Sequence, residues 1–282
     1  MSTPDAPPPT DRAAAALLDE GRPTDTIGGR DLTRWPSAGG RLLLGLAQRV
    51  AHRLAPHQVW ALVLGVGLLL DGLVVVLGAG LYRAVVDGDG VDAVDHPVLQ
   101  LAVEHRTADL TTTAQVVSDV AGVVGMTVVA IATAVVFALL RRRWTPLGLV
   151  VSAMLGSLAL TVVGKLVVGR SRPPLVDAVP PYEHSPSFPS GHTLNATAFA
   201  GVVAYVLLRQ LAARWARVLV VVAAVAFALV VGASRVYLGH HWLTDVLVAY
   251  LLGALWVAVV VTGHRLYLTL RRRPAVGERM GG

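Results

Sequence analysis

The sequence contains no cysteine, and its 24 basic residues include a single lysine, Lys165. Without cysteine, the chain can form neither disulfide bonds nor thiolate metal sites. Charged residues are also scarce: they make up 15% of the chain, against roughly 25% in soluble domains. These absences argue against a soluble globular protein and against a disulfide-stabilised one.

Apolar residues dominate the chain. They account for 54% of its 282 residues, and the mean hydropathy is +0.62. A helix needs about 20 mainly apolar residues to cross a bilayer. Six segments approach or exceed that length, and together they predict an all-α, integral membrane, six-transmembrane-helix bundle: 59–82, 114–140, 147–168, 192–208, 217–233 and 242–263.

The flanking segments differ in composition from the apolar core at 58–264. Residues 1–40 are rich in proline, aspartate, threonine and glycine, which predicts a disordered cytosolic tail. Residues 41–57 mix leucines with arginines and indicate a basic amphipathic helix at the membrane interface. A simple helical lead-in to the first span is the alternative. Residues 265–282 are expected to form a basic cytosolic tail.

Arginines predict the orientation of the spans. They precede the first span, separate the second from the third and the fourth from the fifth, and follow the sixth. Cytosolic loops carry the excess of Lys and Arg, so both termini are expected in the cytosol. This placement also explains the net charge of +6, and no nucleic-acid partner is expected. The acidic loop 83–113 and the polar loops 169–191 and 234–241 then face outward.

A histidine and a carboxylate stand together where the sixth span begins. His241 and Asp245 are four residues apart, so on a helix they share a face. A carboxylate at one imidazole nitrogen fixes the tautomer and makes the other nitrogen a better nucleophile. The neighbouring His240 has Thr244 at the same spacing, and a threonine cannot act in this way. A structural ion pair at a helix start is the competing interpretation.

The segment Ser190-Gly191-His192 precedes the fourth span. Backbone N–H groups at a helix N-terminus bind anions, and Gly191 allows an anion to approach closely. The Ser190 hydroxyl adds a hydrogen-bond donor, and His192 is suited to deliver a proton to a leaving oxygen. A turn that merely caps a helix is the alternative.

Three cations complete the polar segments. Lys165 and Arg172 flank the end of the third span, and Arg235 ends the fifth. Three cations at one membrane face match the three oxygens of a phosphoryl group and the charge of its transition state. Arginines that extend from span ends to the interface are the alternative. Arg170 lies nearby but outside this spacing.

The combined pattern resembles the signature of the type 2 phosphatidic acid phosphatase (PAP2) superfamily. It reads Lys165-x6-Arg172-Pro173, Pro189-Ser190-Gly191-His192 and Ser234-Arg235-x5-His241-x3-Asp245. The superfamily includes lipid phosphate phosphatases, bacterial undecaprenyl-diphosphate and phosphatidylglycerophosphate phosphatases, glucose-6-phosphatase and vanadium haloperoxidases. Every signature position is matched.

The resemblance implies a role for each matched residue. His241 attacks phosphorus to give a phosphohistidine, and Asp245 orients His241. His192 protonates the leaving group and then activates water. The remaining matched residues hold the phosphoryl oxygens: Lys165, Arg172, Ser190, Gly191 and Arg235. No metal and no cofactor is expected.

Two acidic residues inside the spans and one loop remain outside the signature. Asp71 and Asp119 are functional candidates because a membrane carboxylate is costly unless it is paired, although a neutral or hydroxyl-bonded carboxyl group is the favoured interpretation. The loop from Pro174 to Phe188 is interpreted as a rigid proline-rich connector, with a lid over the site as the alternative.

The sequence therefore predicts a metal-independent phosphatase of the acid-phosphatase type in the cell membrane, acting on a lipid phosphomonoester or diphosphate at the outer face. Undecaprenyl diphosphate is the first expected substrate, followed by phosphatidic acid and phosphatidylglycerophosphate. A lipid phosphotransferase shares the first half of the reaction, and a non-catalytic lipid-binding or transport protein is the alternative of another class. The sequence does not indicate the oligomeric state.

Overall fold

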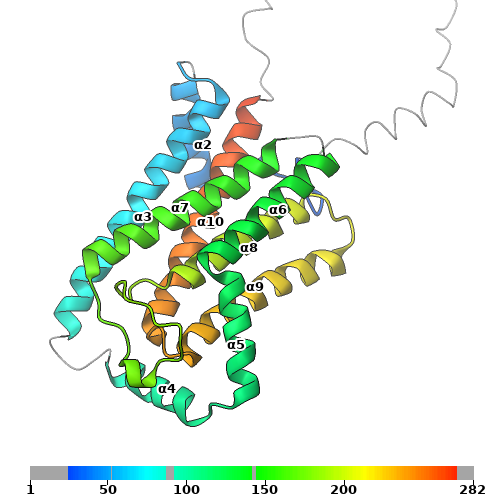
Figure 1. The fold of residues 1–282 in the computed structure, drawn as a ribbon. Coiled ribbons are helices and arrows are strands. Elements are labelled where there is room, and N and C mark those ends of the chain that lie inside the picture. Colours follow the sequence, from blue (N-terminus) through cyan, green and yellow to red (C-terminus); the bar gives the residue numbers. More distant parts are fainter. Residues whose placement is uncertain (1–24, 52, 87–91, 142–143, 272–282) are drawn as a thin grey trace, which may run out of the picture.

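The computed structural model describes residues 25–51, 53–86, 92–141 and 144–271. Nearly all regular structure in these residues is helical, and a two-stranded hairpin precedes the helices (Figure 1). The elements are β1 (Thr26–Ile27), β2 (Arg30–Asp31), α2 (Ala38–Ala51), α3 (Pro56–Val86), α4 (Asp92–Glu104), α5 (Ala108–Ala121), α6 (Val123–Arg141), α7 (Thr145–Val168), the 3-10 turn η1 (Leu175–Asp177), α8 (Gly191–Leu208), α9 (Arg214–Tyr237) and α10 (Leu243–Arg271).

Five helices are long and apolar enough to cross a membrane: α3, α7, α8, α9 and α10. The expected second span is a bent pair instead of one straight helix. Helix α5 ends at Ala121, and α6 continues at an angle of 58°. The Gly122 N–H bonds back to the Asp119 carbonyl at 3.1 Å, which closes α5. The described residues thus contain five membrane-capable helices, or six spans if the bent pair is counted as one.

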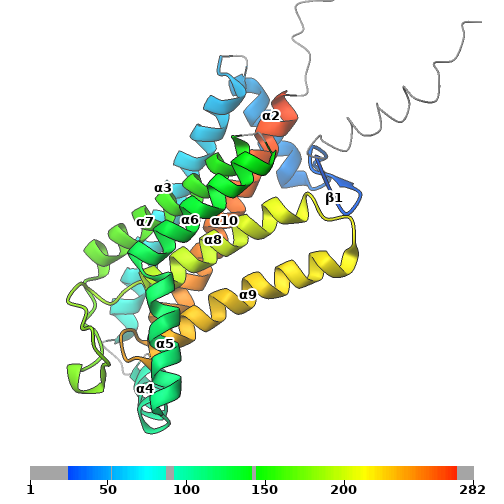
Figure 2. The same ribbon diagram turned by 45° about the vertical axis from the view of Figure 1, so that its right-hand side comes forward.

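Helix α8 lies at the centre of the bundle and packs against α7, α9 and α10. Most of its buried side chains are small or aliphatic, among them Ala198 and Val202, so the neighbouring helices approach closely. Helix α3 packs on α10 and α7 from outside. Figures 1 and 2 show α2 at one end of this bundle and α4 at the other.

The N-terminal hairpin and α2 pack near the C-terminal end of α10. Trp35 donates from Nε1 to Thr269 Oγ1 at 3.2 Å, and the Arg265 guanidinium lies 4.3 Å from the centre of the Trp35 ring. The structured part of the expected tail therefore includes residues 25–40, while residues 1–24 lie outside the described residues. In the expected C-terminal tail, residues 265–271 continue α10, and residues 272–282 lie outside the description.

Two left-handed glycines direct the chain into the loops at the α4 end. Gly169, with φ of 63°, caps α7, and Gly239, with φ of 70°, follows α9. A Cβ at residue 239 would lie 2.2 Å from the Asp177 carbonyl oxygen. Glycine at both positions allows the loops 169–190 and 238–242 to meet.

Candidate active site

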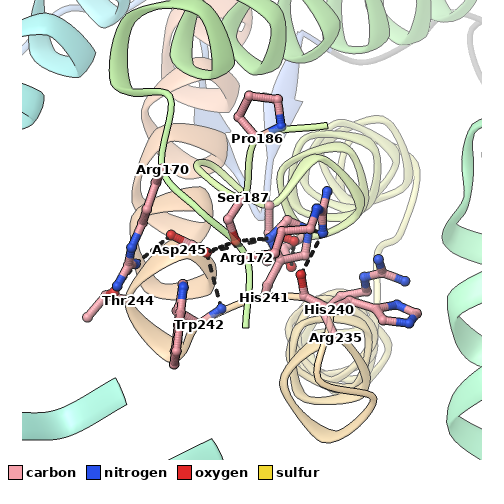
Figure 3. Close-up of polar contacts among 12 residues, drawn as sticks. Arg170, Arg172, Pro186, Ser187, Arg235, His240, His241, Trp242, Thr244 and Asp245 are labelled. Atoms are coloured by element: carbon pink, nitrogen blue, oxygen red, sulfur yellow. Dashed lines mark hydrogen bonds and ion pairs between the residues drawn. The ribbon is translucent and has the colours of Figure 1, made fainter. Parts of the chain in front are cut away.

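The three polar segments found in the sequence meet at the end of the bundle where α4 lies. They come from the loop after α7, the start of α8, the end of α9 and the start of α10. Figure 3 shows the loop residues Arg170 and Ser187 directed towards Asp245 on α10, with His241 beside them. Residues up to 149 positions apart in the sequence are in contact here.

His241 is fully buried and faces Asp245 through one ring nitrogen. Its Nδ1 lies 3.6 Å from Asp245 Oδ2 and 3.3 Å from Ser187 Oγ. Ser187 donates to the same carboxylate oxygen at 2.5 Å. With acceptors on the Nδ1 side, the proton belongs on Nδ1, and Nε2 keeps its lone pair. Nε2 points towards Arg172, whose Nη1 is 3.4 Å away.

Burial keeps the His241 imidazole neutral. It lowers the pKa of His241 to about 4, and Arg235 and Arg172 act in the same direction. Asp245 opposes them without restoring the ordinary value. Above pH 4 the ring is therefore mainly neutral and carries an available lone pair.

Asp245 has more partners than the sequence pattern indicated. Arg170 Nη1 donates to Oδ1 at 2.7 Å, and the Trp242 N–H donates to Oδ2 at 3.1 Å. The Trp242 ring also lies 5.4 Å from the Arg170 guanidinium carbon. A carboxylate with 0% exposure needs such compensation to remain charged.

A second buried carboxylate, Asp95 of α4, holds Arg170 from the other side. The Asp95 Oδ2 accepts from Arg170 Nη2 at 2.6 Å and from Thr244 Oγ1 at 2.6 Å. The Asp95 Oδ1 accepts from the Thr244 N–H at 2.9 Å, near the start of α10. Burial alone would lower the pKa of Arg170, but Asp245 and Asp95 raise it. Arg170 is therefore a charged bridge between two carboxylates.

Glu183, in the loop expected to be a plain connector, lies between two of the expected phosphate-binding arginines. Its carboxylate contacts Arg172 Nη2 at 2.6 Å and also bonds with Arg235 Nη2. Burial favours the neutral acid, yet Arg235 and Arg172 lower the pKa of Glu183 to about 2. A carboxylate thus occupies the position between these two cations.

The remaining expected residues surround this pair. Lys165 donates to Ser185 Oγ at 3.0 Å and to the Pro186 carbonyl. Arg235, with 1% exposure, also donates to Ser118 Oγ on α5. The bend between α5 and α6 therefore delivers a contact to the site.

The Ser190-Gly191-His192 segment begins α8 as expected. The Ser190 hydroxyl is 2.9 Å from Thr193 Oγ1. The backbone N–H of Ser190 donates to the backbone carbonyl of Asp245 at 3.4 Å. His192 Nε2 reaches the bend between α5 and α6, 3.5 Å from where a Cβ on Gly122 would lie. Both His241 and His192 lower the pKa of Glu183, so both rings lie within electrostatic reach of its carboxylate.

Sequence reasoning missed four residues of this network: Asp95, Arg170, Glu183 and Ser187. Arg170 lies two residues before Arg172 in the sequence, but its spacing does not match the signature, so it was not predicted to belong to the site. Asp95 is one of several acidic residues in a polar loop, and no local pattern distinguishes it. Asp119 is exposed, and it interacts electrostatically with Arg235 of this network. No group of three or more His, Asp or Glu suited to a metal occurs among the residues that the structure describes.

Comparison with known proteins gives three matches. Residues 146–267 match the family model described as the PAP2 superfamily. Phosphatidylglycerophosphatase B of Bacillus subtilis (strain 168) is 39% identical over 118 residues, which are 41% of this chain and 56% of that protein. The sequence match therefore spans little more than half of that relative.

The third match is a solved structure, the transmembrane PAP2 type phosphatidylglycerolphosphate phosphatase from Bacillus subtilis. It has a TM-score of 0.60 and 28% sequence identity, and the match covers 67% of this chain and 94% of the other. All three polar segments lie within residues 146–267, whereas Asp95 lies outside them.

Proposed function

We propose that this protein is a membrane lipid phosphatase, because residues 146–267 match the PAP2 superfamily. It removes a phosphoryl group from a lipid phosphate through a covalent intermediate on His241. The observation that carries the proposal is the buried, neutral His241. Its Nδ1 faces Asp245 and its Nε2 faces Arg172.

In the first step His241 Nε2 attacks phosphorus. A P–N bond forms while the bond between phosphorus and the lipid oxygen breaks, and the imidazole becomes a cation. Asp245 stabilises that cation through Nδ1. His192 gives a proton to the leaving oxygen, and Lys165, Arg172 and Arg235 neutralise charge on the phosphoryl oxygens.

In the second step water attacks the phosphohistidine. His192, now the base, takes a proton from that water, and the P–N bond breaks to release inorganic phosphate. Glu183 leaves the space between Arg172 and Arg235 before phosphate enters, because both anions use the same two guanidinium groups.

Phosphatidylglycerophosphate is the first substrate candidate. The two relatives named above support it over undecaprenyl diphosphate, which the sequence had favoured on orientation alone. Phosphatidic acid is the next monoester candidate. The proposal keeps six spans with both termini in the cytosol, as the arginine distribution predicts, and under that orientation the reaction occurs at the outer face of the cell membrane.

The test is phosphate release by the purified protein in detergent with EDTA present. We expect release from phosphatidylglycerophosphate, faster than from phosphatidic acid or undecaprenyl diphosphate. His241→Ala removes the nucleophile and should abolish it. His57→Ala, at an exposed histidine on α3, is the matched control.

The intermediate is tested with 32P-labelled substrate. Rapid acid-free quenching should give label on the protein that is stable in base and labile in acid, and absent from His241→Ala. Release that survives in His241→Ala, or that EDTA abolishes, would contradict the mechanism. A faster reaction with undecaprenyl diphosphate would correct the substrate alone.

A further inference from the structure

A groove separate from the polar site runs along the outside of α3 and α10. It has a volume of about 500 Å³ and is bordered by α2 at one end. Leu62, Val66 and Leu70 of α3 line it and are 46%, 47% and 58% exposed. Helices α2, α3 and α10 contact one another (Figure 1). Because α3 and α10 are membrane-capable helices, the groove opens towards lipid.

One carboxyl group lies at the inner end of this groove. Asp71 lines it, is 5% exposed, and its Oδ2 has no hydrogen-bond partner in the part of the chain that the structure describes. The other lining residues are aliphatic or glycine except for Thr262, which lies on α10 about two turns from Leu255. A carboxyl group in hydrocarbon without a partner costs several kcal/mol.

The position of Asp71 restricts what can satisfy it. Asp71 is 15 residues beyond Pro56, the first residue of α3, or about 22 Å along a helix. Charged headgroups remain at the interface because their transfer into hydrocarbon is unfavourable. A hydroxyl group is neutral, and it donates to a carboxylate or accepts from a carboxylic acid. It therefore fits Asp71 in either protonation state.

We propose that this groove binds a neutral lipid with a free hydroxyl group, of the long-chain alcohol class. The hydroxyl hydrogen-bonds with Asp71, and the chain lies along α3 and α10 towards α2. The distance from Asp71 to Val59, at the α2 end, is twelve residues of helix, or about 18 Å. The site goes beyond the proposed phosphatase reaction, since it contains no phosphate-binding cation.

The experiment uses the full chain in phosphatidylcholine nanodiscs with two photoreactive probes. One is a long-chain alcohol with a diazirine in its chain, and the other is the matched alkane, which has no oxygen to donate or accept a hydrogen bond. Mass spectrometry locates the labelled residues. We expect the alcohol to label α3 and α10 at the groove about fivefold more than the alkane, the preference that one membrane hydrogen bond supports.

Three variants complete the test. Asp71→Leu, which fits the apolar surroundings, should remove the preference for the alcohol. Asp71→Asn should keep it, because an amide also bonds with a hydroxyl. Asp119→Leu, at an exposed aspartate on α5, should leave it unchanged.

Equal labelling by the two probes, labelling outside the groove, or a preference that persists in Asp71→Leu would each overturn the proposal. Failure of both probes to label the groove, because a second copy of the chain covers it, would also overturn it. Phosphate release is measured on the same nanodiscs, so failure of the proposed phosphatase reaction is seen separately.

Discussion

His241 combines a low affinity for protons with the orientation that a nucleophile needs. Burial and two nearby arginines keep the ring neutral, while Asp245 and Ser187 fix the nitrogen that carries its proton. The same carboxylate would stabilise the imidazolium once Nε2 is phosphorylated. The surroundings of His241 therefore suit both the neutral ring before attack and the imidazolium that follows it.

The pKa of His241 gives the first prediction. Histidine-labelled protein in detergent, followed by NMR, should show the His241 ring neutral above pH 4 and titrating near that value. Arg172 lowers the pKa of His241, so Arg172→Gln should shift the titration to higher pH. A His241 that titrates at or above the ordinary value of about 6.5 would contradict this account.

Asp95 gives the second prediction, as a positioning residue that acts through Arg170. Asp95→Asn keeps the acceptor for the Thr244 N–H but removes the charge that faces Arg170. We expect kcat to fall about tenfold, or about 1.4 kcal/mol, with KM nearly unchanged. Asp109→Asn, at an exposed aspartate on α5, is the control. An effect confined to KM, or none in folded protein, would exclude the role.

At the scale of elements, the loop 169–190 is the part of the fold that differs most from expectation. It supplies Arg170, Glu183, Ser185 and Ser187, all in contact with site residues. The helices α4 and α5 hold it in place: Arg106 donates to the Asp177 carbonyl at 2.6 Å, and Gln115 donates to the Pro180 carbonyl at 3.0 Å. The loop therefore belongs to the pocket rather than only joining two spans.

Glu183 gives the prediction for this loop. Glu183→Gln removes the negative charge that competes with phosphate for Arg172 and Arg235. We expect vanadate or inorganic phosphate to inhibit the variant at about tenfold lower concentration than the wild type. Glu104→Gln, at an exposed glutamate ending α4, should behave like wild type. Weaker inhibition of Glu183→Gln would show that Glu183 assists anion binding.

At the scale of the whole molecule, the two ends of the bundle differ in chemistry. One end holds the ion-pair network around His241, and the other holds α2, the hairpin and the end of α10. The positive-inside rule predicts that the second end lies in the cytosol. Part of its sequence evidence, Arg142 and Arg143, lies outside the described residues.

The absence of cysteine makes this orientation testable. A single cysteine is introduced by Tyr182→Cys in the loop 169–190 or by Trp215→Cys at the start of α9. The native side chains at these positions are 47% and 72% exposed. A membrane-impermeant maleimide should label Tyr182→Cys in intact cells, and Trp215→Cys only after permeabilisation. The cysteine-free parent is the control, and the reverse pattern would invert the proposed orientation.

The sequence by itself determined the membrane class, the approximate positions of the helices and the eight candidate site residues within the signature. Each of these depends on local information: apolar runs long enough to span a bilayer, and polar residues at fixed spacings that interrupt them. The start of α8 at Gly191 and the pairing of His241 with Asp245 follow from a few adjacent residues.

The tertiary structure alone decided which other residues complete the site. Asp95 meets Arg170 across 75 positions, and Ser187 meets Asp245 across 58. The bend at Gly122 brings Ser118 to Arg235 across 117. Such contacts carry no sequence periodicity, because they depend on how separate helices pack and where loops fold back. For the same reason only the fold shows that Asp71 lines an apolar groove and that its Oδ2 has no hydrogen-bond partner among the described residues.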